Sequence, residues 1–259
     1  MTDLWADREF LRDVQYRTDA NLAARQSIYA CQHPPIDLPA RVLDLAAPAA
    51  GETVADIGCG NGAYLADLAR RGFAGRVIGA DLSAGMLIAA RGRAGAAALI
   101  AADATAVPLR DGAADLTLAM HMLYHVPDPR LAIRELRRVT RAGGRVVVGL
   151  NAADHLRELR ALIAAARGAD LPPPGERLRL DDGEALLRTV FSSVTRHDFI
   201  GELRIPGPEP VADYVRSMSQ TLDHADPERL VAEVVAAAFP AGPGQGLRVT
   251  THSGCLVCG

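Results

Sequence analysis

The stretch VADIGCGNGAYL, residues 54–65, places three glycines within five positions, between an apolar run and a helical pattern. Gly58 follows a predicted strand, Gly60 permits a ligand to approach the backbone closely, and Gly62 opens the next helix. Such a loop suits a nucleotide bound at the carboxyl ends of parallel strands. Gly58-x-Gly60-x-x-Ala63 also fits the dinucleotide fingerprint, so an NAD-dependent oxidoreductase is an alternative at this point.

Three aspartates accompany this loop. Asp56 lies two residues before the first glycine, where a carboxylate would face a cationic ligand group rather than a pyrophosphate. Asp81 ends the next predicted strand and can accept hydrogen bonds from both hydroxyls of a ribose. Asp103 ends the third predicted strand and can accept from the exocyclic amine of adenine. Together these carboxylates favour a ligand that carries ribose, adenine and a positive charge over a dinucleotide.

The composition argues against several other functions. The sequence contains no lysine, which excludes Schiff-base enzymes and Walker-type phosphate loops. The formal net charge is −3 without a basic cluster, so we expect no nucleic-acid partner. No apolar run approaches the ~20 residues that span a bilayer, so we expect no membrane segment and a cytoplasmic protein. Cys255 and Cys258 have no second ligand pair, which favours buried structural cysteines over a zinc site.

From about residue 52 the chain alternates short apolar runs with helical patterns, which is typical of a parallel sheet covered by helices. The predicted fold class is therefore α/β, with a doubly wound sheet. Five strands are predicted within residues 53–150, and two more near 193–205 and 246–258. Helices are expected near 152–167 and 183–190, on either side of a proline-rich connector. Further helices are expected within residues 3–48 and 207–245.

Four segments in this order resemble a known family: VADIGCGNG, GADLS, AADATAVPLRDGAADLTLAMHMLYHVPDP and RAGGRVVV. They are similar to the class I S-adenosylmethionine-dependent methyltransferases, in the broad subgroup that includes ubiquinone and menaquinone biosynthesis enzymes. The resemblance covers about residues 50–150. It implies S-adenosylmethionine as cofactor, S-adenosylhomocysteine as product and a small-molecule methyl acceptor. The acceptor's identity, the methylated atom (O, N or C) and the oligomeric state do not follow from the sequence.

The resemblance also assigns the cofactor site. The amino-acid end would lie at Asp56, Gly58, Gly60 and Gly62, and the ribose at Asp81. Leu82 and Met86 would flank the adenine. The remaining positions expected in the cofactor site meet the adenine amine or border the cofactor from neighbouring segments; they are Asp103, Ala104, Cys59, Met120 and Tyr16.

The same resemblance implies a Rossmann-like seven-stranded sheet, mostly parallel with an antiparallel last strand, and a variable cap over the substrate. We expect an N-terminal helical cap at residues 1–48. The cofactor-binding core is expected at 49–206 plus 246–259, with a helical insertion at 207–245 that covers the substrate site. Tyr16, Arg25 and Tyr29 of the front helices could close over the cofactor or substrate. Packing between helices is the alternative for the two tyrosines.

His121, Tyr124 and His125 form the titratable cluster that follows the fourth predicted strand. A neutral imidazole is a suitable base near pH 7, and His121 is the first choice. The alternative is that the histidines only fix the loop. Met120 stands where a metal-assisted methyltransferase would need a carboxylate, so no metal is expected. A catalytically inactive, cofactor-binding homologue is the second alternative to a methyltransferase.

Overall fold

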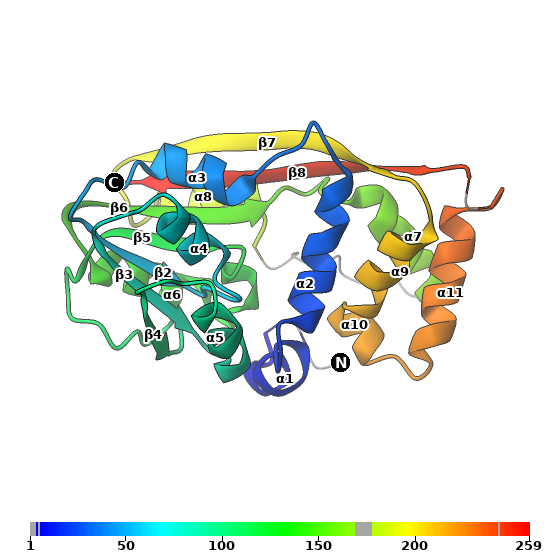
Figure 1. The fold of residues 1–259 in the computed structure, drawn as a ribbon, viewed down its shortest axis with the longest axis horizontal. Coiled ribbons are helices and arrows are strands. Elements are labelled where there is room, and N and C mark those ends of the chain that lie inside the picture. Colours follow the sequence, from blue (N-terminus) through cyan, green and yellow to red (C-terminus); the bar gives the residue numbers. More distant parts are fainter. Residues whose placement is uncertain (1–3, 5, 169–177, 243) are drawn as a thin grey trace.

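The computed structural model describes residues 4, 6–168, 178–242 and 244–259. Its centre is one sheet with the strand order β1-β7-β8-β6-β5-β2-β3-β4 (Figure 1). Neighbouring strands from β4 to β6 pair in parallel, whereas β8 is antiparallel to both β6 and β7. The strands are β1 Gln32–His33, β2 Thr53–Ile57, β3 Arg76–Asp81, β4 Ala98–Ala101, β5 Ala114–Met120, β6 Thr140–Asn151, β7 Val194–Ile205 and β8 Leu247–Cys258.

This topology confirms the predicted fold class. The antiparallel last strand, β8, lies between β6 and β7, so the core has the seven expected strands. The sequence did not predict β1, a two-residue strand that pairs with Leu203 and Glu202 of β7 and makes eight. Asp103 lies two residues beyond the end of β4, in the following loop rather than at the strand end.

Helices cover both faces of the sheet. On one face α3 (Leu38–Ala46) and α4 (Ala63–Arg70) pack through one buried cluster, and α5 (Ala84–Arg91) shares a second cluster with α4. On the other face α6 (Pro129–Val139) and α8 (Leu180–Leu187) bury Ile133, Leu136 and Leu187. Local signals set the helix starts: Ser83 caps α5, and Asp128 caps α6 with Pro129 in the first turn.

The N-terminal segment lies between the sheet and a separate helical group (Figure 1). It contains the short helix α1 and the π-helical turn η1, then α2 and the 3-10 turn η2. Their bounds are α1 Arg8–Phe10, η1 Leu11–Gln15, α2 Ala20–Ser27 and η2 Ile28–Cys31. α3, which lies within the cap predicted at residues 1–48, packs against α4 in a cluster that also contains buried residues of the sheet.

The helical group has a hydrophobic core of its own. It includes buried residues from α7, α9 and α11 and from the far ends of β7 and β8, which extend from the sheet to these helices (Figure 1). The helices are α7 Arg157–Arg167, α9 Pro208–Arg216, α10 Ser219–Leu222 and α11 Pro227–Ala238. The predicted helix near 152–167 begins at Arg157, because residues 153–156 form turns. Most of the proline-rich connector lies outside the described residues.

None of the helices in the described part of the chain is both long and apolar enough to cross a membrane.

Candidate active site

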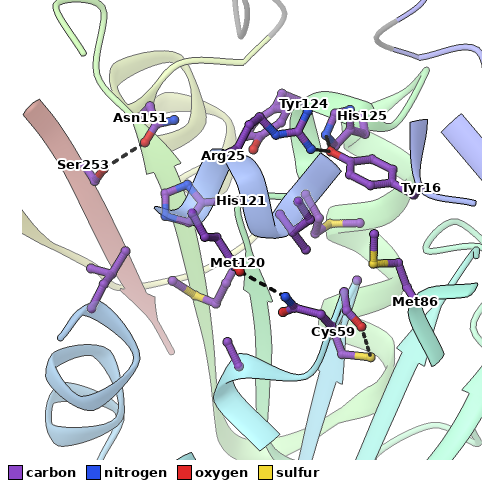
Figure 2. A pocket seen from close by; sticks show the side chains of 18 of the residues that line it. Tyr16, Arg25, Cys59, Met86, Met120, His121, Tyr124, His125, Asn151 and Ser253 are labelled. Atoms are coloured by element: carbon purple, nitrogen blue, oxygen red, sulfur yellow. Dashed lines mark hydrogen bonds between the residues drawn. The ribbon is translucent and has the colours of Figure 1, made fainter. Parts of the chain in front are cut away.

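A cavity of about 610 Å³ lies at the carboxyl ends of β2, β3 and β5, under the N-terminal segment (Figure 2). Its volume is within the usual range for small-molecule sites, and its place follows the rule for open α/β sheets. Asp56 and Gly62 do not line it. The other predicted residues do, namely Tyr16, Gly58, Cys59, Gly60, Asp81, Leu82, Met86, Asp103, Ala104, Met120, His121, Tyr124 and His125.

All three loop glycines have positive φ, a conformation that glycine adopts without the steric cost of a Cβ. A Cβ at Gly58 would lie 2.6 Å from the Met122 side chain, and one at Gly60 would lie 3.2 Å from Leu22 of α2. Gly62 has a different role, because its Cβ would lie 3.0 Å from that of Ala90 in α5. Gly58 and Gly60 line the cavity, whereas Gly62 allows the loop to pack closely against α5.

Asp56 is fully buried behind the loop. Neither of its carboxylate oxygens has a hydrogen-bond partner within the described residues. Burial, with a smaller contribution from the charge of Asp81, raises its pKa to about 7. A buried carboxylate without a partner is costly, so this position favours either a proton or a cationic group nearby.

Asp81 is held rigidly at the end of β3. Its Oδ2 accepts a hydrogen bond from Gly60 N at 2.8 Å, and its Oδ1 accepts from Ser83 N at 2.9 Å. Burial raises its pKa, although these backbone hydrogen bonds oppose the shift. Each carboxylate oxygen can accept a further bond, so the side chain can still receive two hydroxyls from the cavity.

Asp103 is already engaged. Its Oδ1 accepts from Thr105 N and from Thr105 Oγ1, at 2.8 and 2.7 Å, and its Oδ2 pairs with Arg8 at 2.9 Å. The ion pair is half-exposed and links the start of α1 to the loop after β4. Asp103 therefore both lines the cavity and ties down the N-terminal segment.

Tyr16, Arg25 and His125 form one hydrogen-bonded group (Figure 2). Arg25 donates to Tyr16 Oη at 2.9 Å, and Tyr16 Oη lies 2.9 Å from His125 Nε2. Since a guanidinium can only donate, the tyrosine proton is available for His125 Nε2, which then acts as acceptor. His125 is thereby occupied as a partner of the N-terminal segment.

His121 follows β5 with a left-handed backbone (φ 54°), which is uncommon for a residue other than glycine. Its backbone N–H donates to Gly149 O, which holds this conformation, whereas its imidazole has no hydrogen-bond partner within the described residues. Burial lowers the pKa of His121 to about 4, so the ring is neutral at pH 7. An uncommitted neutral imidazole in the cavity can accept a proton, although it is a weak base.

A second polar group lies in the cavity around Tyr29, and of its members only Tyr29 was expected near the ligands. Tyr29 Oη lies 2.8 Å from His155 Nε2, and His252 N donates to His155 Nδ1 at 3.1 Å. Beside them, Ser253 donates to Asn151 Oδ1 at 2.9 Å (Figure 2). Asn151 ends β6 and His155 lies in the turn that follows it, and a position at a strand's carboxyl end is a signal that could have found them. Nothing local marks Ser253 as a lining residue.

Comparisons with known proteins agree with this architecture. A family model described as a methyltransferase domain matches residues 55–148. The malonyl-(acyl-carrier protein) O-methyltransferase of Serratia marcescens is 31% identical over 191 residues, covering 70% of this chain and 68% of that protein. A demethylmenaquinone methyltransferase of Beutenbergia cavernae is 38% identical over 106 residues, covering 41% and 43%. An uncharacterized protein in a transposon of Streptomyces fradiae is 43% identical over 103 residues, and the match covers 38% of this chain and 30% of that protein.

The chain belongs to the S-adenosylmethionine-dependent methyltransferase family. A candidate methyltransferase from Bacillus halodurans has the same fold, with a TM-score of 0.61 at 17% identity, covering 86% of this chain and 98% of the other. The members of this family are enzymes that use S-adenosylmethionine as cofactor. The alternative of an NAD-dependent oxidoreductase is therefore not supported.

The residues present fit this cofactor. Its ammonium and sulfonium groups are cationic, and the glycine loop lies in front of the unpartnered carboxylate of Asp56. Asp81 retains acceptor capacity for a ribose diol. Leu82, Met86 and Ala104 line the cavity beside it with apolar atoms that suit a purine face. These acceptor groups and apolar atoms therefore suit a cationic nucleoside better than a pyrophosphate.

Proposed function

We propose that this methyltransferase transfers a methyl group to a small molecule held in the 610 Å³ cavity. When bound, S-adenosylmethionine supplies a methyl group on a positively charged sulfur. The observation that carries the proposal is that the cofactor-type residues and the polar group around Tyr29 and His155 line the same cavity. Nucleophile and methyl donor would thus share one site, and positioning them is the main requirement of such a displacement.

For the cofactor we propose three roles. Asp81 binds the ribose hydroxyls, Asp56 provides the negative charge behind the amino-acid end, and Asp103 borders the adenine amine. Gly58 and Gly60 let the ligand approach the backbone. The hydrogen bond between Asn61 Nδ2 and Gln26 Oε1, 3.0 Å long, supports this arrangement because it ties the glycine loop to α2.

For the chemistry we propose that His121, rather than His125, is available to the acceptor. His125 Nε2 is committed to Tyr16, whereas the His121 ring has no hydrogen-bond partner within the described residues. Burial raises the pKa of Tyr124 well above its ordinary value, which keeps its hydroxyl protonated as a hydrogen-bond donor. His125 is a positioning residue in this proposal.

We further propose a metal-independent reaction. Met120 ends β5, and its thioether is no ligand for a hard cation such as Mg²⁺. The described residues contain no group of three or more His, Cys, Asp or Glu side chains arranged to hold a metal. The test is a titration of methyl transfer with a chelator such as EDTA. Unchanged turnover is expected, and loss of turnover that Mg²⁺ restores would contradict the proposal.

The proposed activity is tested with S-adenosylmethionine labelled in its methyl group and a panel of small carboxylic acids, phenols and amines. We expect label transfer by the wild-type protein and at least a tenfold loss in Asp81→Asn, which keeps the side-chain shape but loses the charge. If S-adenosylhomocysteine binds and no panel compound is methylated, the inactive, cofactor-binding alternative is favoured instead. Small molecules in cofactor or specialised metabolism are the proposed acceptors.

A further inference from the structure

One wall of the cavity presents hydrogen-bond donors and positive charge. We call it the acceptor wall and define it by Arg25, Tyr29, Tyr124, His155 and Tyr214, all of which line the cavity. Arg25 and Tyr29 are four residues apart, in the continuous helical segment formed by α2 and η2, so they share a face. Desolvation raises the pKa values of the Tyr29, Tyr124 and Tyr214 hydroxyls, and the nearby charge of Arg25 opposes this rise. The Tyr29 side chain as a whole remains 38% exposed.

The orientation of the Tyr29 proton follows from its partners. His252 N–H can only donate, so His155 Nδ1 is the acceptor and the imidazole proton lies on Nε2. That Nε2–H then donates to Tyr29 Oη at 2.8 Å. The hydroxyl hydrogen of Tyr29 is left to donate elsewhere, and Tyr29 lines the cavity. Burial lowers the pKa of His155 to about 3, so this arrangement persists at neutral pH.

Arg25 adds a positive charge without a carboxylate partner. It donates to Tyr16 Oη and to Ser217 O, and its guanidinium carbon lies 5.2 Å from the centre of the Tyr16 ring. Within the described residues, no Asp or Glu lies within ion-pair distance of it. A cation without a carboxylate partner that lines the cavity favours an anionic ligand.

Carboxylates line other parts of the cavity. Asp81 is bonded to the backbone of Gly60 and Ser83, and Asp103 to Thr105 and Arg8. Asp37 caps the first turn of α3. Among the described lining residues these three are the only acidic side chains, and none belongs to the acceptor wall. An ammonium group would therefore find no counter-charge there.

On the basis of the proposed function, we propose that the methyl acceptor is an oxyanion, a carboxylate or an ionised phenol, which Arg25 and Tyr29 bind and orient for O-methylation. In this step the acceptor oxygen forms a bond to the methyl carbon as the carbon–sulfur bond breaks, and that bond's electron pair stays on sulfur. The oxyanion and sulfonium charges cancel, and no proton has to be removed. This agrees with the weakly basic His121 and the protonated tyrosines.

The inference is tested by binding. In protein loaded with S-adenosylhomocysteine, 4-nitrophenol reports its own ionisation, because its phenolate absorbs visible light and its phenol form does not. We expect binding to lower the pKa of the probe by about one unit. Benzoate should bind at least tenfold more tightly than benzylamine, which has a similar size and the opposite charge.

Four variants assign the effect to the acceptor wall. Arg25→Gln should abolish most of the shift and Arg25→Lys should retain it, while Tyr29→Phe should weaken benzoate binding about fivefold. Arg130→Gln removes an exposed arginine of α6 that does not line the cavity and should change nothing. Thermal unfolding of each variant shows that it is folded, and Arg25→Lys separates loss of charge from damage to the N-terminal segment.

Three results would overturn the inference: a bound probe with unchanged ionisation, no saturable binding of either oxyanion probe, or benzylamine binding as tightly as benzoate. Failure of the proposed function is a separate outcome, because it would show as absence of S-adenosylhomocysteine binding, or as binding without transfer of label to any compound of the panel. Radiolabel transfer to amines but not to acids or phenols would also contradict O-methylation while leaving the methyltransferase proposal in place.

Discussion

At the residue scale, the buried carboxylate of Asp56 gives the cofactor-free protein a distinctive pH dependence. Its folded-state pKa of about 7 lies above the ~3.9 of an unfolded chain, so the folded state binds the extra proton between these values. The contribution of this proton to the free energy of unfolding is therefore fully present below about pH 4 and is lost as the pH rises through about 7. Between these values the free energy of unfolding falls by up to about 1.4 kcal/mol per pH unit.

Asp56→Asn removes this titration and should flatten the curve. We expect the free energy of unfolding of the variant, relative to the wild type, to increase from pH 5 to about pH 7 and then to level off. Urea unfolding at each pH measures this difference. Parallel curves for the two proteins would show that Asp56 does not carry a raised pKa.

At the element scale, the turn from β2 to α4 depends on a close contact with α5. Gly62→Ala adds a Cβ 3.0 Å from the Cβ of Ala90, at φ +81°. Gly72→Ala is the matched control, since it has φ +65° and no heavy atom within 4 Å of its new Cβ. Both variants lose about 1 kcal/mol for the left-handed backbone, and Gly62→Ala should lose a further 1–3 kcal/mol or so from overpacking.

Denaturant unfolding of the two variants measures that difference directly. Equal losses would mean that the contact between the glycine loop and α5 relaxes without cost. In that case the glycine at 62 is needed for its backbone conformation alone.

The sequence predicted those helices and strands whose signals lie within a few neighbouring residues. The strand over 114–120 and the helix capped by Asp128 are found as expected, because a short apolar run marks the strand and a capping side chain marks the start of the helix. The two-residue β1 was missed, since its pairing with β7 involves residues far apart in the sequence. The pairing of Tyr29 with His155, 126 positions apart, leaves no local signature either.

The same distinction applies to the site. Glycines and carboxylates near the ends of predicted strands indicate a cofactor crevice, and Gly58, Gly60, Asp81 and Asp103 do line the cavity. Asp56 was expected at its edge but is buried behind the loop, because it lies within β2, one residue before the strand ends, whereas Asp81 is the last residue of β3. The acceptor wall could not be predicted, because it combines residues of α2, η2, the 3-10 turn η3 (Leu123–His125), α9 and the turn after β6.

At the scale of the whole molecule, the N-terminal segment connects the two parts of the fold. Ser83 donates to Tyr16 O at 2.6 Å on the side of the sheet. On the other side, Gln15 donates to Ser217 O at 3.0 Å and accepts from Ser219 at 2.7 Å. We propose that this segment and the insertion, 207–245, form a lid that closes further when ligands bind.

Hydrogen exchange with and without S-adenosylhomocysteine tests the lid. We expect amides of residues 8–31 and 208–238 to gain protection together with the glycine loop, because α2 borders the cavity and is linked to α9 through Ser217. Protection confined to the glycine loop would show instead that these helices are fixed walls of the substrate site.

The central claim is that the cavity binds S-adenosylmethionine through Asp81. Calorimetric titration with S-adenosylhomocysteine tests it most directly, with NADH as the competing ligand and Asp81→Ala as the variant. We predict saturable binding of S-adenosylhomocysteine, none of NADH, and at least a tenfold weaker affinity in the variant, since each hydrogen bond to a charged group contributes about 1.5–3 kcal/mol. Retention of NADH alone, or an unchanged dissociation constant in Asp81→Ala, would contradict the account.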